Sequence, residues 1–589
     1  MELVQTNEKE SNVLIRINDL TVWTKEEKSW WTRRPSRSNS LILDNVSGCI
    51  MENEFAAVIG PSGAGKTTFL VALAGKTRLP SDGMVTVRGT DIKDLPGIVE
   101  MVPQFDVFVE KITVMEHLVF MIEMKIGDSK NPINCTKLNA LLKELRLSSL
   151  KNTSIGCLSG GERKLLSLAT SLLSDPQILI CDEPTTGLDS YNAFLVVESL
   201  RNLASSGRVV VCSVHQPSSD LFREFNSIML MAQGKLVFHG SHDECRELFK
   251  SVNLNCPKNY NPAEYYIRSV SGLNSDSNVG RLLYSFKERS QCKTDEETKA
   301  IHTQTHRRNW FKQVHLLLWR TSLTLKRDMR SEIYQLLLGV IMSSIVMGTC
   351  YVGISGTTQR GIQDIRGLLW LMTSEVSFSV SYCALYVFET DLTLFRREVG
   401  LYSCTAYFVT AFLRFVPRCV VWPITLVLIA TLAVDLPEHS LTAVEFIAVL
   451  IVTALSASAY GLGMGALFSS TGLMSDVMPC ADLPLFLMSG AFLRLSSLPR
   501  WLYPVKYVSH FYYGMDAVSN IYWRKIGEID CPSNSTPPCV RDGDSVLSET
   551  GYSENFVLQD SLGLILVIVM WSLLGYLGLK REEKKGYAY

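Results

Sequence analysis

Apolar and polar positions are arranged differently in the two parts of this chain. Up to about residue 330 they mix over short stretches, whereas long apolar runs follow. Hydropathy predicts six membrane-spanning segments in the second part. Because a backbone in lipid must satisfy its own hydrogen bonds, we expect these segments to be helices. The predicted spans are Ile333–Gly353, Gly367–Phe388, Cys419–Val434, Phe446–Ser475, Val477–Leu493 and Ser561–Leu579.

The distribution of basic side chains predicts the orientation of these spans. Lys and Arg precede the first span, lie between the second and third, and follow the last, whereas residues 435–445 carry none. Both termini are therefore predicted to be cytosolic, in a multi-pass protein of the plasma membrane or of an intracellular vesicle membrane. Residues 1–12 are polar and unlike a cleavable signal peptide, so we expect an internal span to direct insertion.

Residues 494–560 are predicted to form an extracytosolic loop. Cys531 and Cys539 are candidates for a disulfide within it. An Asn-Ser-Thr sequon makes Asn534 a candidate glycosylation site. The alternative is an unused chance match, because Pro537 follows the sequon directly.

A glycine-rich loop in the first part predicts an ATP site. A short apolar strand over residues 54–59 leads into it, and an apolar helix pattern follows. The loop has the form G-x-x-x-x-G-K-T, in which backbone N–H groups and a helix N-terminus cradle phosphates. Lys66 would reach the β- and γ-phosphates, and Thr67 would place its hydroxyl on Mg²⁺. The predicted binding residues are Gly60, Pro61, Ser62, Gly63, Ala64, Gly65, Lys66, Thr67 and Thr68.

Two carboxylates follow a second apolar strand, residues 177–180. Beside a phosphate loop, Asp182 would hold Mg²⁺, and Glu183 would polarise the attacking water as the catalytic base. This pair alone is a weak signal, because acidic residues follow apolar runs at many surface turns.

Further motifs occur in a fixed order around these residues. Gln104 is followed by the segment Leu158-Ser159-Gly160-Gly161-Glu162, which begins an apolar-periodic helix before the acidic pair. Gly187-Leu188-Asp189 comes after the pair, and His215 follows the next strand. The whole order resembles the ATP-binding cassette (ABC) family over about residues 15–240.

This resemblance implies that each chain carries half of two ATP sites. Ser159, Gly160 and Gly161 would bind the γ-phosphate held by the glycine loop of a partner chain. Gln104 would sense Mg²⁺ as one of its ligands, together with Thr67 and Asp182. His215 would contact the γ-phosphate as a catalytic residue beside Lys66 and Glu183, and Asp189 would meet the opposing subunit.

An ATPase that precedes six spans in one chain resembles the G subfamily of ABC half-transporters, the White/Brown/Scarlet group. Asn261–Tyr266 and Phe395–Glu398 add to this likeness. It implies an α/β ABC-type P-loop ATPase domain followed by an all-α six-span membrane domain. The chain would work as a homodimer, or as a heterodimer with another G-type half-transporter, and would contact membrane lipid. It would move small organic or lipid-like substrates, with export from the cytosol.

The resemblance also implies segment boundaries. These are an ATPase domain at 1–270, a linker at 271–306, an amphipathic connecting helix at 307–330, a membrane domain at 331–580 with the extracytosolic loop 494–560, and a cytosolic tail at 581–589.

In this subfamily the substrate cavity lies between the second and fifth spans. The likeness assigns Glu375, Phe378, Leu483 and Phe486 to it, with Ala491 and Phe492 in a plug above. An acid inside a span is costly unless it is paired or wet, so Glu375 would favour a cationic or hydrogen-bond-donating substrate. The alternative is a Glu375 near the interface or paired within the protein. Asp482 is predicted to be structural or interfacial.

One feature departs from the family pattern, which places an aromatic ring upstream of the glycine loop to stack on adenine. Val22 occupies that position here, with Trp23 next to it. Either Trp23 stacks on the base, or adenine is held by apolar packing alone.

The charge balance and the cysteines exclude other classes. With 57 Lys+Arg against 58 Asp+Glu, the chain lacks the basic excess of a nucleic-acid binder. Among the 15 cysteines no CxxC pair with zinc spacing occurs. A regulator or translation factor with paired cassettes would lack the spans. A supporting subunit that does little transport of its own remains an alternative, although such a subunit is expected to lose Glu183 or the LSGGE segment.

Overall fold

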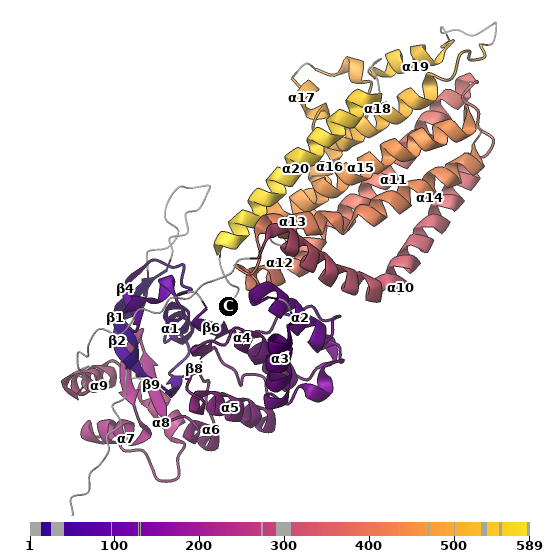
Figure 1. Ribbon diagram of the computed structural model, residues 1–589. Helices are drawn as coiled ribbons and strands as arrows, with labels where there is room; N and C mark the ends of the chain where they lie inside the picture. The colour runs from indigo at the N-terminus through magenta and orange to yellow at the C-terminus, as the bar shows by residue number, and fades with distance from the viewer. Residues whose placement is uncertain are drawn as a thin grey trace, which may run out of the picture. The chain divides into compact units, whose positions relative to one another are not determined.

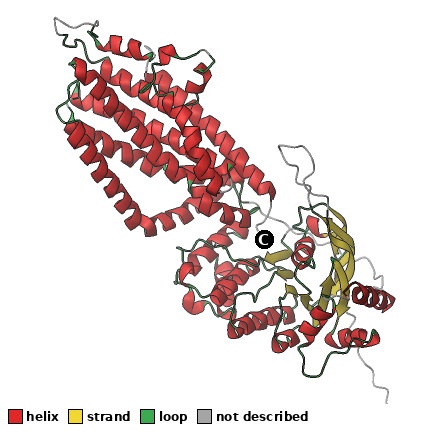
Figure 2. Cartoon of the chain, turned by 180° about the vertical axis from the view of Figure 1, so that it is seen from behind, coloured by secondary structure: helices red, strands yellow, loops and turns green. Residues whose placement is uncertain are grey.

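The computed structural model describes residues 13–24, 40–95, 97–127, 129, 131–271, 275–289, 308–434, 436–468, 471–499, 501–531, 539–552 and 557–585. The chain divides into two compact units between Arg308 and Asn309. All strands of the described residues lie in the first unit, and the second is helical (Figure 2). The predicted fold class, an α/β ATPase domain followed by an all-α membrane domain, is confirmed.

The first unit contains two sheets. The larger has the order β10-β9-β3-β8-β7-β6, and its strands are parallel except for β10. Four of these strands (β3, β7, β8 and β9) are wholly buried, as expected for a parallel sheet covered on both faces. The strands are β3 (Phe55–Ile59), β6 (Val99–Val102), β7 (Ile178–Cys181), β8 (Val209–Ser213), β9 (Ser227–Ala232) and β10 (Lys235–Gly240).

The smaller sheet is antiparallel, with the order β2-β1-β4-β5. Its strands are β1 (Val13–Trp23), β2 (Leu41–Met51), β4 (Ser81–Val87) and β5 (Thr90–Asp91). Buried residues of both sheets join with α1 in one core. The helices of this unit are α1 (Lys66–Leu73), α2 (Val114–Lys125), α3 (Pro132–Glu144), α4 (Gly160–Leu172), α5 (Ser190–Ser205), α6 (Ser219–Arg223), α7 (His242–Ser251), α8 (Pro262–Ser269) and α9 (Ser275–Arg289) (Figure 1).

The second unit is a helical bundle. Among its described residues, five segments are long and apolar enough to cross a membrane: α10, α11, α13 with α14, α15 and α20. The fifth predicted span, Val477–Leu493, corresponds to α16, which is only 17 residues long and contains Pro479 and Pro484. The helices are α10 (Trp310–Cys350), α11 (Gln359–Leu385), α12 (Val387–Arg397), α13 (Cys404–Leu413), α14 (Val416–Ala433), α15 (His439–Leu467), α16 (Thr471–Leu487), α17 (Tyr503–Lys506), α18 (His510–Trp523), α19 (Gly543–Thr550) and α20 (Val557–Lys585).

The predicted connecting helix and first span form one helix, α10, which bends along its length (Figure 1). The segment predicted as the loop 494–560 also contains helices among its described residues. It contains α18, whose side chains are buried against α11, α15 and α20. A hydropathy window of span length cannot detect a helix of 14 residues that is stabilised by packing.

Helix α15 lies at the centre of the bundle and packs against α11, α14, α18 and α20. Small residues allow these close approaches. A side chain at Gly461 would clash with the carbonyl oxygen of Ser381 on α11, and one at Gly578 on α20 would clash with that of Ala466. The second predicted span, α11, therefore packs closely against α15 at the centre of the unit.

Candidate functional site

The phosphate loop (Gly60–Thr68) connects β3 to α1 and needs its glycines. Gly65 caps α1 at a φ of 92°, in the left-handed region that favours glycine. A side chain at Gly60 would clash with the carbonyl oxygen of Met231. The loop therefore brings its backbone against the start of a helix, where N–H groups and the helix dipole favour a phosphate.

Lys66 is buried at the end of this loop. Its ammonium donates hydrogen bonds to the carbonyl oxygens of Gly60 at 2.9 Å and Pro61 at 3.0 Å. Burial lowers the pKa of Lys66, while the charges of Glu183 and Asp182 act in the opposite direction. The ammonium thus shares its surroundings with the two carboxylates that follow β7.

The two carboxylate oxygens of Asp182 differ in their described hydrogen bonds. Oδ1 accepts a hydrogen bond of 2.5 Å from the Ser213 hydroxyl at the end of β8. Oδ2 is buried and has no hydrogen-bond partner among the residues that the structure describes. A buried carboxylate oxygen with a spare lone pair suits a hard cation such as Mg²⁺. Asp182 therefore fits the predicted metal, which would neutralise phosphate charge when bound. The role of Thr67 as a second ligand stays a prediction.

Glu183 is positioned from three sides. Its Oε2 accepts hydrogen bonds from Gln104 Nε2 at 2.7 Å and from the Thr186 hydroxyl at 2.9 Å, and its N–H donates to Ser213 Oγ at 2.7 Å. Its φ of 44° is in the left-handed region, which costs energy for a residue other than glycine. The surrounding contacts hold the carboxylate at the strand end in spite of that cost.

Gln104 and His215, the other two predicted residues near the phosphate loop, differ in their contacts. The side-chain amide of Gln104 donates to the Glu183 carboxylate. His215 is exposed just after β8 and precedes Gln216, which also has a φ of 44°. The two strained residues therefore follow neighbouring parallel strands, β7 and β8, at the same edge of the sheet.

The signature segment (Leu158–Glu162) forms a separate part of the site. Ser159 caps α4 in a capping box: its hydroxyl accepts from the Glu162 N–H, and Glu162 accepts from the Ser159 N–H at 2.9 Å. Ser159 and Gly160 are exposed. Across the described part of the chain, no hydrogen bond or ion pair links residues 159–161 to residues 60–68. Among the described contacts, the signature segment is therefore separate from the phosphate loop.

Two supporting residues were not predicted from the sequence. Ser213 bridges Asp182 and Glu183, and its only local signal is a polar residue ending an apolar strand. Lys164 of α4 is buried and donates to the carbonyl oxygens of Pro103 at 3.1 Å and Gln104 at 3.0 Å, while pairing with Asp106. It ties the helix after the signature segment to the Gln104 backbone.

Of the residues considered for adenine, Val22 is fully buried in β1, so its side chain belongs to the core. Trp23 follows it on the opposite face of the strand and is only half-buried. Base stacking by Trp23 stays a prediction.

In the membrane unit the predicted substrate residues come together in part. The rings of Phe378 on α11 and Phe486 on α16 lie 6.0 Å apart, and Phe511 on α18 is 5.0 Å from Phe378. Trp370 and Phe492 extend this aromatic cluster through Phe486 at 5.2 and 5.3 Å. Leu483 is exposed.

The two acids predicted inside the second and fifth spans differ in their surroundings. Asp482 is buried, and its Oδ1 accepts a hydrogen bond of 2.6 Å from the Tyr460 hydroxyl. Its structural or interfacial role stays a prediction. Glu375 is half-buried, one helical turn before Phe378.

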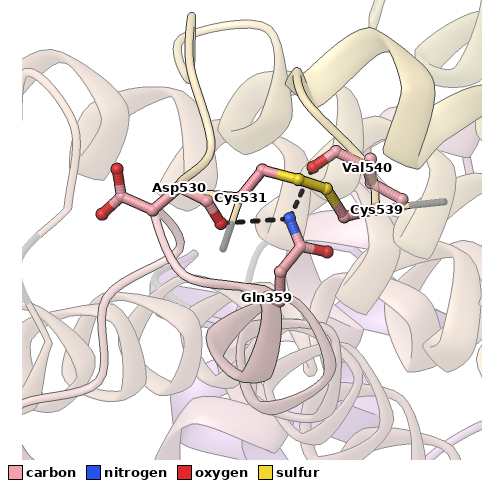
Figure 3. Close-up of a disulfide and its surroundings, with 5 residues drawn as sticks. All are labelled: Gln359, Asp530, Cys531, Cys539 and Val540. Carbon is pink, nitrogen blue, oxygen red and sulfur yellow. Dashed lines mark hydrogen bonds between the residues drawn. A yellow bond between two sulfur atoms is a disulfide. The ribbon is translucent and has the colours of Figure 1, made fainter. Parts of the chain in front are cut away.

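A disulfide joins Cys531 and Cys539 (Figure 3). Gln359, in the first turn of α11, donates to the carbonyl oxygens of Asp530 at 3.3 Å and Val540 at 2.6 Å on either side of it. The candidate glycosylation site, Asn534, lies outside the described residues.

Comparison with known proteins agrees with this architecture. The ABC transporter family model matches residues 43–186, and ABC-2 type transporter models match residues 215–289 and 312–523. The chain is 31% identical to protein white of Drosophila melanogaster, covering 92% of this chain and 84% of that protein. It is 28% identical to protein brown, with 95% of both chains covered, and 31% identical to protein scarlet, with 92% and 86% covered, both of the same species.

Proposed function

Because the chain belongs to the White/Brown/Scarlet group of ABC half-transporters, we propose that two such chains pair in a membrane and use ATP to export small organic or lipid-like molecules from the cytosol. The chain binds ATP and couples its hydrolysis to transport across the membrane. The pairing, the direction, the substrate class and the residue roles are the proposal. Both termini would be cytosolic, in the plasma membrane or a vesicle membrane.

The proposal of a dimer is supported by the separation of the phosphate loop from the signature segment within one chain. Lys66, Asp182 and Glu183 form one group with the phosphate loop, whereas Ser159 and Gly160 are exposed and make no bond to that group among the described residues. An exposed serine at a helix N-terminus is a ready donor for a phosphate. A second chain would bring this serine to the γ-phosphate and close the site.

The residues would then divide the work of hydrolysis. Lys66 would hold the β- and γ-phosphates, and Glu183, oriented by Gln104, would orient and polarise the attacking water. Mg²⁺, held by Thr67, Asp182 and Gln104, would supply charge neutralisation to the phosphates. His215 would contact the γ-phosphate, and Asp189 would meet the opposing chain.

Mixed dimers test the shared site. Lys66→Ala chains and Ser159→Arg chains, with different affinity tags, are co-expressed in a Glu183→Gln background that slows hydrolysis. Each pair with one chain of each kind keeps one complete site, so we expect one trapped ATP per mixed pair. Pairs that carry the same defect twice should trap none. If each chain completed its own site, mixed pairs would also trap none.

Transport itself is measured with the purified chain alone in lipid vesicles. Wild type should take up substrate in an ATP-dependent manner, and Glu183→Gln should not. A panel of tryptophan metabolites, purines and sterols covers the small organic and lipid-like classes. ATP hydrolysis without uptake of any compound by the single chain would favour a heterodimer with another G-type half-transporter over a homodimer.

A further inference from the structure

The ammonium of Lys164 is buried, and its described contacts all reach the loop of residues 103–106. It donates to the carbonyl oxygens of Pro103 at 3.1 Å and Gln104 at 3.0 Å, and it lies 3.1 Å from Asp106 Oδ2. An ammonium has three N–H donors, so these three acceptors account for all of them. Both charged side chains are less than 10% exposed, at 4% and 9%, so salt screens the pair little. One side chain thus fixes this loop to α4.

Gln104 connects the same loop to the proposed catalytic base. Its side-chain amide donates to Glu183 Oε2 at 2.7 Å, and the Thr186 hydroxyl donates to the same oxygen at 2.9 Å. Thr186 belongs to the turn that follows Glu183, whereas Gln104 is 79 residues away in the sequence. The direction of the carboxylate therefore depends on where the loop holds the Gln104 backbone.

The helix that carries Lys164 begins at the signature segment. Ser159 caps α4, and Lys164 follows five residues later, about 7.5 Å along the helix axis. From Lys164 to Leu172 every side chain of α4 is buried, so packing fixes the helix in the unit. Within one chain, α4 thus joins the serine that would close one ATP site to the base of the other.

We propose that Lys164 is a positioning residue for ATP hydrolysis, which holds the Gln104 loop against α4 so that the Gln104 amide keeps the Glu183 carboxylate oriented. This deepens the proposed function and rests on it, because Glu183 acts there as the base. In this role Lys164 touches neither phosphate nor water. Its loss should therefore lower kcat and leave the affinity for ATP nearly unchanged.

A double-mutant cycle separates this role from a purely structural one. Lys164→Met removes the ammonium, and Gln104→Ala removes the amide but retains the carbonyl oxygen that Lys164 contacts. ATP hydrolysis by the full-length assembly in lipid nanodiscs is measured for the two single variants and the double variant. We expect Lys164→Met to lower kcat about tenfold with little change in KM, and to lower it far less when Gln104 is already alanine. Single-turnover hydrolysis of radiolabelled ATP covers variants that are too slow for steady-state measurement.

Three further variants control for loss of folding. Lys164→Met leaves the buried Asp106 carboxylate without its counter-ion, which destabilises the fold. Adding Asp106→Asn removes that charge and should raise the thermal midpoint without restoring kcat. Lys125 forms another ion pair in the same unit, 2.7 Å from Glu100, and Lys125→Met should lower the thermal midpoint while leaving kcat unchanged. Lys164→Arg keeps the charge and should retain part of kcat.

The outcomes distinguish this inference from the function on which it rests. A wild-type assembly that does not hydrolyse ATP contradicts the proposed function. If wild type hydrolyses ATP and Lys164→Met lowers kcat by the same factor with and without the Gln104 amide, the role of Lys164 is structural and the inference is overturned. An unchanged kcat for Lys164→Met overturns it as well.

Discussion

Arg320 of α10 and Glu398 after α12 form a buried ion pair with two hydrogen bonds. Nη1 lies 2.6 Å from Oε1 and Nη2 lies 3.0 Å from Oε2, and both side chains are less than 10% exposed, at 7% and 6%. The Tyr402 hydroxyl also donates to Glu398 at 2.6 Å. The predicted connecting helix is thus fixed to the turn between the second and third predicted spans.

Breaking this pair should destabilise the membrane unit strongly. Glu398→Gln leaves the Arg320 charge buried without its counter-ion, which costs about 3–5 kcal/mol. The exposed pair Arg494–Glu549 is a matched control, and Glu549→Gln should cost about 0–1 kcal/mol. Thermal unfolding of the full-length protein in detergent measures both. Equal shifts of the thermal midpoint for the two variants would mean that the buried pair contributes no more to stability than the exposed pair.

The Ser213 hydroxyl should control the Mg²⁺ requirement of hydrolysis. Ser213→Ala removes the donor to Asp182 and leaves the Glu183 N–H without its acceptor, at a cost of about 1–3 kcal/mol. We expect half-maximal ATPase activity to need about tenfold more free Mg²⁺, because Asp182 is no longer oriented. Ser199→Ala, which removes a hydroxyl that only bonds its own helix, is the control. An unchanged Mg²⁺ titration would contradict this role of Ser213.

The ATPase unit shows which features can be predicted from the sequence and which cannot. The strand predicted over residues 54–59 and the helix beginning at the LSGGE segment match β3 and α4, because apolar runs and caps are local signals. The contacts of Ser213 with Asp182 and of Lys164 with Gln104 join residues far apart in the chain. Only the register of the sheet and the packing of α4 bring them together.

The membrane unit shows the same limit. Long spans such as α15 and α20 are detected because their apolar length exceeds what a soluble helix needs. Helix α18, with Asp516 and Asn520 in its sequence, was predicted as part of a loop. Its burial depends on α11, α15 and α20 surrounding it, which no local pattern encodes.

Acid should destabilise the protein partly through Glu54. Burial raises the pKa of this carboxyl, but the hydrogen bond and charge of His239, 2.6 Å away, together with Ser227 and the Met51 N–H, outweigh it and hold the pKa below 4.5. A lowered pKa in the folded state contributes stability above the unfolded value, and this is lost as the pH falls through the folded pKa. We therefore expect the free energy of unfolding of the full chain, measured from pH 7 to below pH 4.5, to fall more steeply with falling pH in wild type than in Glu54→Gln. Parallel pH curves would contradict the contribution of Glu54.

The Cys531–Cys539 disulfide should stabilise the start of α11 through Gln359. Closing a loop of this length restricts the unfolded chain by about 2–3 kcal/mol. Replacing both cysteines by serine should lower the free energy of unfolding by that amount, which is measured as a lower thermal midpoint. Gln359→Ala should lower the midpoint less, because it removes two hydrogen bonds and leaves the covalent link. Cys256→Ser, at a free cysteine in the first unit, is the control. If reduction with a membrane-impermeant thiol lowers the midpoint of wild type but not of the double serine variant, the effect belongs to this bond. If reduction changes neither, the loop is held by the Gln359 contacts alone.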